Sequence, residues 1–164
     1  MTASWRQFES QAPELAALGE AQLGRTGLAL VGTLRRDGWP RISPVEPFIV
    51  DGQLYLGMMW RSVKALDLLR DSRCVVHSTV SDREGTEGEF KVYGRAVEVT
   101  SLDERRRFAD AVYAAIGFRP EEPEFHCFSI AIESVVFSQL RDGQFHRQVW
   151  KANDKRKDAE TQRK

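Results

Sequence analysis

The residues best suited to chemistry lie at the start of a short expected helix, where Ser62 has Arg61 before it and Lys64 after it. Ser62 is of a type that often caps a helix, but a cation at this positive end typically costs about 0.3–1 kcal/mol. A bound anion would reverse that cost, because backbone N–H groups, a hydroxyl and two cations would converge on it. The pattern is therefore typical of a phosphate site. In the alternative interpretation, both long side chains simply point into solvent. The helix itself is indicated by apolar residues at helical spacing: Val63, Leu66 and Leu69.

Other chemistry-bearing residues show weaker patterns. His77, His126 and His146 lack the spacing of metal ligands, so no metal site is expected. Cys74 and His77 are three residues apart in an expected strand, which directs them to opposite faces and disfavours a nucleophile–base pair. Cys74 and Cys127 lie in apolar runs and are expected to be buried free thiols.

Three aromatic residues leave two interpretations open. They could stack on a flat ligand, or they could pack in the core or in a subunit interface. These residues are Trp39, Tyr55 and Trp60.

Composition limits the class of protein. The 164 residues are 41% hydrophobic and carry a formal net charge of zero, which suits one soluble domain with a sizeable core. A neutral chain lacks the basic footprint of a general nucleic-acid binder. No signal peptide or membrane-spanning run is evident. We therefore expect a cytoplasmic protein with no nucleic-acid or membrane partner.

The first half of the chain predicts helix followed by a three-stranded meander. Residues 1–25 have a helical pattern, with Pro13 suited to a first turn. Strands are expected at 28–34, 41–50 and 53–59, joined by Asp-Gly turns. Pro44 and Pro47 cannot donate to a strand ladder, so the second strand should contain an edge, a bulge or a bend.

The second half predicts further strands and a helix. Strand-like runs occur at 73–80, 90–100, 125–132, 134–140 and 144–150. Ser101 and Glu104 form a capping-box pattern before an amphipathic helix that ends at Gly117. The sum is a mostly β (α+β) fold: an antiparallel β-barrel of six or seven strands whose ends are covered by helices.

Three segments follow from this organisation. Residues 1–27 form an N-terminal helical segment, and residues 28–150 form the barrel domain. Residues 151–164 contain many charges and no large apolar residue, so a disordered tail is expected there.

Several short motifs follow one another along the chain: Leu30–Leu34, Asp37–Pro40, Arg41–Val45, Asp51–Gly52, Arg61–Lys64 and Leu68–Arg73. In this order and spacing they resemble the flavin-binding split β-barrel family typified by pyridoxamine 5′-phosphate oxidase. The resemblance covers roughly residues 25 to 150 and implies a split barrel of six or seven antiparallel strands. It also implies a homodimer with two shared sites, each holding FMN or the related deazaflavin coenzyme.

The resemblance also implies roles for particular residues. Ser62 and Lys64 match the Ser-x-Lys phosphate clamp of the family, which Arg61 extends. Arg41 and Ser43 match a strand whose side chains lie along the phosphate and ribityl chain. The strand segment that borders the flavin ring corresponds to Met58 and Met59. An aromatic or basic position contributed by the partner subunit resembles Trp150.

The resemblance implies a flavin- or deazaflavin-dependent oxidoreductase that transfers hydride to or from a small molecule, with the redox chemistry supplied by the cofactor. No indispensable catalytic side chain is expected. Residues 144–148 offer no equivalent of the Arg and His motif that binds vitamin B6 phosphates, so that substrate is not expected. The alternatives are a non-catalytic FMN or haem carrier, and a β-barrel interaction module without cofactor.

Overall fold

The computed structural model describes residues 1–152, which form seven strands and four helices. The part of the expected tail from 153 to 164 lies outside the described residues. Within the described part of the chain, no helix is both long and apolar enough to cross a membrane. The elements in order are α1 (Trp5–Gln11), α2 (Pro13–Gly24), β1 (Ala29–Leu34), β2 (Pro40–Val50), β3 (Gln53–Met59), α3 (Val63–Arg70), β4 (Arg73–Ser78), β5 (Glu89–Glu98), α4 (Leu102–Ile116), β6 (Phe125–Arg141) and β7 (Gln144–Lys151).

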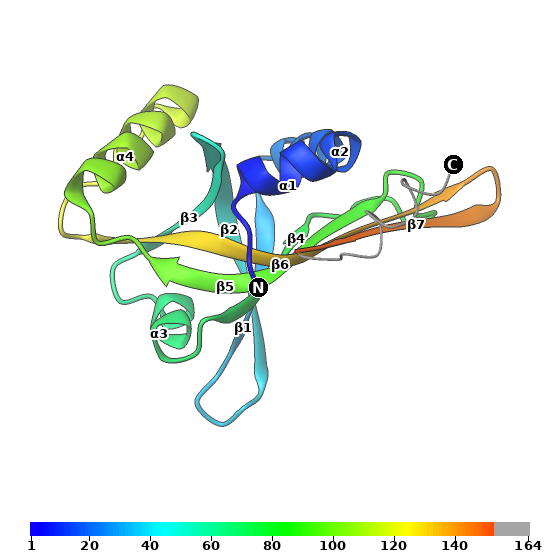
Figure 1. Cartoon of the computed structure of the whole chain (residues 1–164). Coiled ribbons are helices and arrows are strands. Elements are labelled where there is room, and N and C mark those ends of the chain that lie inside the picture. Colours follow the sequence, from blue (N-terminus) through cyan, green and yellow to red (C-terminus); the bar gives the residue numbers. More distant parts are fainter. Residues whose placement is uncertain (153–164) are drawn as a thin grey trace.

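The strands are antiparallel and close into a barrel. Their order is β3-β2-β1-β4-β5-β6-β7, and an additional pairing of β3 with β6 joins six of them into a ring. β7 continues from the far half of β6 as a hairpin that projects from the barrel (Figure 1). The predicted split barrel is confirmed. Lys151, which the sequence placed in the tail, is the last residue of β7.

One long strand, β6, replaces the two strands expected at 125–132 and 134–140. Tyr93 pairs with Ser134 whereas Gly94 pairs with Ile132, so Glu133 is the extra residue of a β-bulge. A bulge kinks a strand without ending it. The apparent break at Glu133 was therefore a local irregularity within a single strand.

The two prolines of β2 lie where that strand has one neighbour. Residues 40–45 pair with β1, and residues 46–50 pair with β3. Pro44 thus lies in the half that faces β1, and Pro47 lies in the half that faces β3. The predicted edge or bend is confirmed, because neither residue has to donate to strands on both sides.

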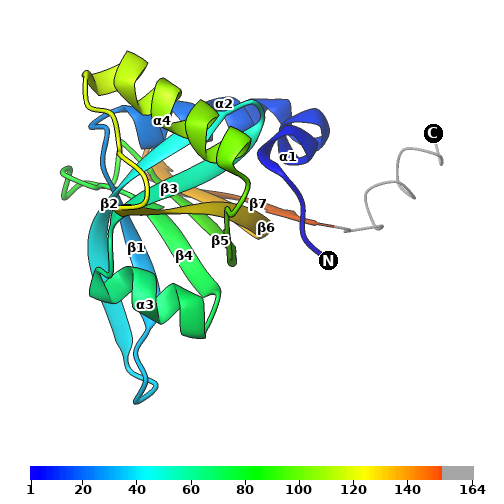
Figure 2. The ribbon, with the colours of Figure 1, turned by 90° about the vertical axis from the view of Figure 1, so that its left-hand side faces the viewer.

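Helices cover both ends of the barrel (Figure 2). α1, α2 and α4 lie at one end and α3 at the other, and one continuous core joins α1, α2 and α3 to the barrel strands. α2 packs so closely on Phe90 that a Cβ on Gly19 would lie 2.3 Å from the ring. The expected single N-terminal helix is two helices, because α1 ends at Ala12 and Pro13 starts α2.

The helix caps differ from the sequence pattern. The predicted box at Ser101 is half made: its hydroxyl accepts from the Glu104 backbone N–H at 3.4 Å, but the Glu104 carboxylate accepts from the Tyr55 hydroxyl at 2.6 Å. A complete capping box occurs instead at Ser4 and Gln7, at the start of α1.

Both cysteines are free, as predicted. Cys74 and Cys127 are buried, and burial raises the pKa of each thiol to about 12. Neither thiol is therefore a ready nucleophile at neutral pH.

Candidate functional site

A buried carboxylate attaches α3 to the barrel. The side chain of Asp67 is 4% exposed and accepts hydrogen bonds from Thr33 on β1 at 2.9 Å and from Arg41 on β2 at 2.7 Å. Arg70 donates to its other oxygen at 3.1 Å and also donates to the Leu34 carbonyl. Desolvation opposes ionisation of Asp67, but the three donors outweigh it and hold the pKa of the carboxyl below its usual range. These contacts place the start of α3 beside β2.

The turn into α3 has an unusual backbone. Arg61 has φ of 56°, and the Ser62 N–H donates to the Met59 carbonyl at 3.0 Å. The other two non-glycine residues with positive φ in the described chain are Asp51 and Asp142, in Asp-Gly hairpin turns where this conformation is common. At Arg61 it costs about 1–2 kcal/mol. This strained residue lies directly before the N-cap of α3, and backbone strain of this kind is common at functional sites.

The Ser62 hydroxyl has no partner. Ser62 is the N-cap residue of α3, as predicted, but its side chain makes no capping hydrogen bond. Its Oγ is buried and has no hydrogen-bond partner among the described residues. A buried hydroxyl without a partner typically costs about 1–3 kcal/mol, so this atom is poised for an acceptor from outside the chain.

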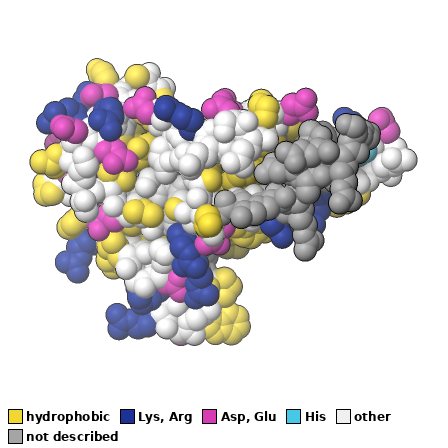
Figure 3. Space-filling view, viewed as in Figure 1, with side chains coloured by type: hydrophobic (Ala, Val, Ile, Leu, Met, Phe, Trp, Pro, Cys, Tyr) yellow, Lys and Arg dark blue, Asp and Glu magenta, His cyan; other side chains and the backbone are white. Residues whose placement is uncertain are grey.

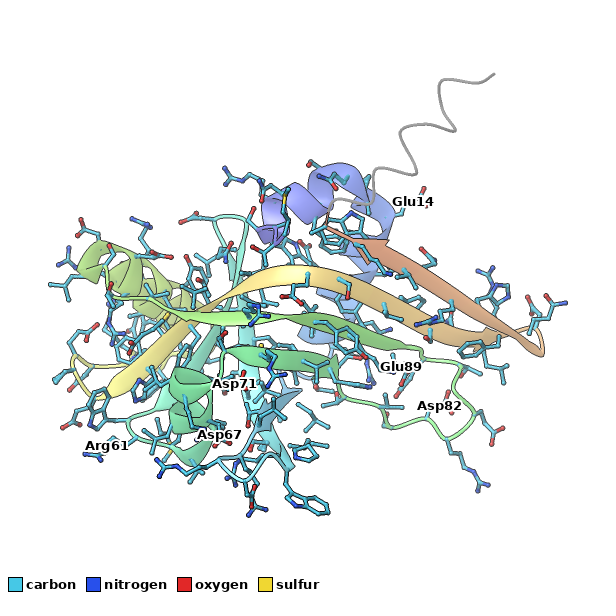
Figure 4. The ribbon with its side chains drawn as sticks, turned by 60° about the horizontal axis from the view of Figure 1, so that its bottom comes forward. Glu14, Arg61, Asp67, Asp71, Asp82 and Glu89 are labelled. Carbon is cyan, nitrogen blue, oxygen red and sulfur yellow. The ribbon has the colours of Figure 1, made fainter. Side chains whose placement is uncertain are left out.

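Lys64 reaches back from α3 to β2. Its Nζ donates to the Pro44 carbonyl at 2.6 Å, and partial burial lowers the pKa of its ammonium. An ammonium has three donors, so this single bond leaves capacity for another acceptor. Arg61, by contrast, is exposed and extends outward, away from Asp67 (Figure 4).

The structure brings most of the predicted residues together. Arg41 and Ser43 lie on the stretch of β2 that Asp67 and Lys64 hold beside α3. Met58 and Met59 end β3 directly before the turn, with Met58 buried and Met59 exposed. Arg41 differs from the expectation in being already paired, since its Nε donates to Asp67.

Trp150 is not part of this group. It lies on β7, is 8% exposed, packs against Phe8 at a ring distance of 4.9 Å and donates to Gln11 at 3.2 Å. Because its own chain covers the ring, little of Trp150 is available to a ligand.

The apolar face used to predict α3 is exposed. The side that faces the barrel carries Ala65, Asp67 and Leu68, whereas Val63, Leu66 and Leu69 are turned outward. Two of these residues line a hollow of about 490 Å³ between α3 and the β1–β2 hairpin, together with four arginines and two aspartates. Lysine and arginine side chains gather over this end of the molecule in Figure 3. The hollow is lined by Arg35, Arg36, Asp37, Arg41, Val63, Leu66, Asp67 and Arg70.

The aromatic residues divide between the two interpretations. Trp60 stacks on His126 at 4.5 Å, with 12° between the ring planes, and is half exposed beside the α3 turn. Tyr55 is buried and packs against Phe108, while Trp39 is exposed at the β1–β2 turn. Both ring nitrogens of His126 lack a hydrogen-bond partner among residues 1–152, and Glu98 lies 3.7 Å from Nδ1.

A pocket of about 380 Å³, which the sequence did not predict, lies beside the end of β3. α4 approaches β3 closely here, since a Cβ on Gly57 would lie 2.8 Å from the Phe108 ring. The segment after α4 closes the other side. The pocket is lined by Glu46, Phe48, Gly57, Met58, Met59, Phe108, Val112, Phe118, Arg119, Pro120, Glu121, Glu124 and Phe125. Only the contrast between the apolar α4 face and the acidic 120–124 loop signals it in the sequence.

Several solved structures have a similar fold at low sequence identity. One is a protein from Clostridium acetobutylicum, related to general stress protein 26 and of the pyridoxinephosphate oxidase family. It has a TM-score of 0.62 and 13% identity over 91% of this chain and 97% of its own. General Stress Protein 26 from Bacillus anthracis has a TM-score of 0.59 and 20% identity over 84% and 98% of the two chains.

A third similar structure is a heme binding protein from Mycobacterium smegmatis, with a TM-score of 0.59 and 18% identity over 80% of this chain and 57% of that one. No protein-family model matches the sequence, and a search of the curated proteins finds no match. The chain therefore has the pyridoxamine 5′-phosphate oxidase-like split-barrel fold, and function must be argued from its own site.

Asp67→Asn should lower the free energy of unfolding at neutral pH by about 3 kcal/mol. This value is the lower end of the range for breaking a buried ion pair, because the side chains of Arg41 and Arg70 are about one third exposed. The folded-state pKa of Asp67 is depressed, so its contribution is present above its unfolded pKa near about 3.9 and is lost as pH falls further. Urea denaturation of parent and variant should give curves that converge below about pH 4.

Asp71→Asn is the matched control, since Asp71 pairs only with its neighbour Arg73 at the surface (Figure 4). It should change stability little. Equal stability of the parent and Asp67→Asn at neutral pH would show that the buried carboxylate does not anchor α3.

Proposed function

We propose that the protein is an FMN- or deazaflavin-dependent oxidoreductase acting on a small molecule. The observation that carries the proposal is the buried, unpartnered Ser62 hydroxyl at the start of α3, beside the desolvated Lys64 ammonium. A phosphate would supply the acceptor that Ser62 lacks and the negative charge that suits this end of the helix. The split-barrel fold supports the same conclusion.

In this proposal Ser62, Lys64 and Arg61 hold the phosphate. Arg41, fixed by Asp67, and Ser43 lie along the chain that joins the phosphate to the ring, while the backbone at Met58 and Met59 borders the ring. The basic hollow between α3 and the β1–β2 hairpin adds to the attraction for an anion. When bound, the cofactor supplies the hydride chemistry, so the chain itself needs only to bind and orient.

We also propose that the protein is a homodimer. Buried residues of β1, β2 and β5 face the barrel interior, while the alternate residues expose an apolar outer strip: Leu30, Ile42, Tyr93 and Val97. These side chains are 37–72% exposed, so the described residues leave the strip uncovered. An exposed apolar surface that continues beside a candidate site is typical of a subunit interface.

A second candidate is an FMN or haem carrier without catalysis. Its support is the pair of unpartnered His126 nitrogens, since histidine is a common haem ligand, together with the similar heme binding protein. Against it, His126 is 3% exposed and covered by Trp60. A Soret band after titration with haemin, abolished by His126→Ala, would favour this candidate.

Lys64→Ala should weaken FMN binding by about ten- to a hundredfold, because loss of one charge-assisted contact to a partly desolvated phosphate costs about 1.5–3 kcal/mol. Quenching of flavin fluorescence measures the dissociation constant, which should be micromolar for the parent. If Lys64→Ala binds FMN as tightly as the parent, the phosphate is not held at the start of α3.

Ser62→Ala should also weaken FMN binding, but without loss of apo stability. Its Oγ makes no capping bond, so removing it should leave the apo melting temperature unchanged or raised. Ser101→Ala is the control: that hydroxyl does cap α4, so it should cost about 0.5–2 kcal/mol of stability and leave FMN binding intact. The reverse pattern would identify Ser62 as a purely structural residue.

Ile42→Glu should convert the dimer to a monomer, because it places a charge in the outer strip, on the strand next to Leu30, while Arg41 and Ser43 keep their orientation toward α3. Light scattering measures the mass. Phe145→Glu is the matched control, since its side chain is 69% exposed, close to the 72% of Ile42, but lies on the projecting β6–β7 hairpin. A parent that is monomeric at micromolar concentration contradicts the shared-site proposal.

A further inference from the structure

The pocket between α4 and the end of β3 is the strongest feature that the proposed function leaves unused. It lies directly against Met58 and Met59, where the flavin ring is proposed, and on the far side of the Trp60 turn from the phosphate site. At about 380 Å³ it falls in the lower part of the size range of small-molecule sites.

The floor of the pocket is apolar and rigid. Met58, Phe108, Val112 and Phe125 line it and are each at most 6% exposed. Phe108 packs at 6.1 Å from Phe125, with 23° between the ring planes. Such a floor accepts the body of an aromatic or aliphatic molecule, while the Phe125 ring already has the Arg105 guanidinium 4.2 Å from its centroid.

The rim of the pocket is negatively charged. Glu46, Glu121 and Glu124 are exposed, and none of them lies within ion-pair distance of a cation among residues 1–152. The rim contains one cation, Arg119, which is paired with Asp110 and lies 5.5 Å from the Tyr113 ring. The field at the mouth is therefore that of carboxylates, opposite in sign to the basic surface around α3.

We infer that this pocket binds a small organic cation, with its apolar body on the Phe108–Phe125 floor and its ammonium group toward the glutamates of the rim. This inference rests on the proposed function in one respect: beside a flavin ring, the pocket is where the substrate lies. The basic surface around α3 then favours the cofactor phosphate, and the acidic rim of the pocket favours the cationic substrate. A second copy of the chain covering the pocket is the competing occupant.

The test uses three probes with one naphthalene frame and different charge: 1-naphthylmethylammonium, 1-naphthylmethanol and 1-naphthoate. Calorimetry on the full chain should rank their affinities in that order. Amide NMR shifts caused by the ammonium probe should map to Gly57, Val112 and Phe118. Glu121→Gln combined with Glu124→Gln should weaken the ammonium probe by about two- to tenfold, as expected for two exposed charges, and leave the alcohol unchanged.

Glu14→Gln is the matched control, because this exposed carboxylate lies on α2, far from the pocket (Figure 4). It should leave all three affinities unchanged. The inference is overturned if the naphthoate binds as tightly as the ammonium probe, or if the double variant has no effect. It is also overturned if the shifts map elsewhere, or if the pocket amides respond to protein concentration alone, as a second copy would make them.

Each titration is repeated with saturating FMN, which separates the two proposals. Binding of the ammonium probe without any binding of FMN would end the flavin proposal and leave the cation pocket in place. Binding of FMN without discrimination among the three probes would end the inference about the pocket and leave the flavin proposal in place.

Discussion

The arrangement of the candidate site depends on one buried carboxylate. Asp67 on α3 accepts hydrogen bonds from both β1 and β2, and these bonds add to the packing of Ala65 and Leu68 in the core. A buried ion pair is weak evidence for stability, but its directional bonds specify one orientation. Because α3 has this orientation, its first residues and the side chain of Lys64 lie beside the stretch of β2 around Ser43.

The regions on the two sides of the turn between β3 and α3 differ in their chemistry. From the end of β3 the chain passes through a strained turn at Arg61 into α3, so a cationic surface and an apolar, acid-rimmed pocket lie on either side of Met58 and Met59. An anionic, flat ligand with a small partner molecule suits this arrangement. The closed strand ring and its helices provide a rigid support, which functional sites require for accurate positioning.

Period-two alternation, short apolar runs and Asp-Gly turns predicted where most of the strands lie, because these signals are local, whereas the single strand β6 was predicted as two. The helix at 63–70 was predicted correctly, but its orientation was not: Val63, Leu66 and Leu69 gave the period, yet the residue that faces the barrel is Asp67, whose partners come from distant strands. Likewise, the local sequence predicted that Glu104 completes a capping box, but in the folded chain its carboxylate accepts a hydrogen bond from the Tyr55 hydroxyl instead. The pocket could not be predicted, since it requires the contact of Phe108 with Gly57. The fold was therefore predictable from local pattern, whereas the site depended on tertiary pairing.

The central claim is that a flavin-type cofactor belongs to this chain. It is tested most directly by the visible absorption spectrum of the protein as purified, followed by mass identification of any released small molecule. The account predicts an FMN or deazaflavin spectrum, or its appearance at one cofactor per chain after incubation with micromolar FMN or deazaflavin. A protein that stays colourless and binds neither cofactor at tenfold higher concentration would contradict it.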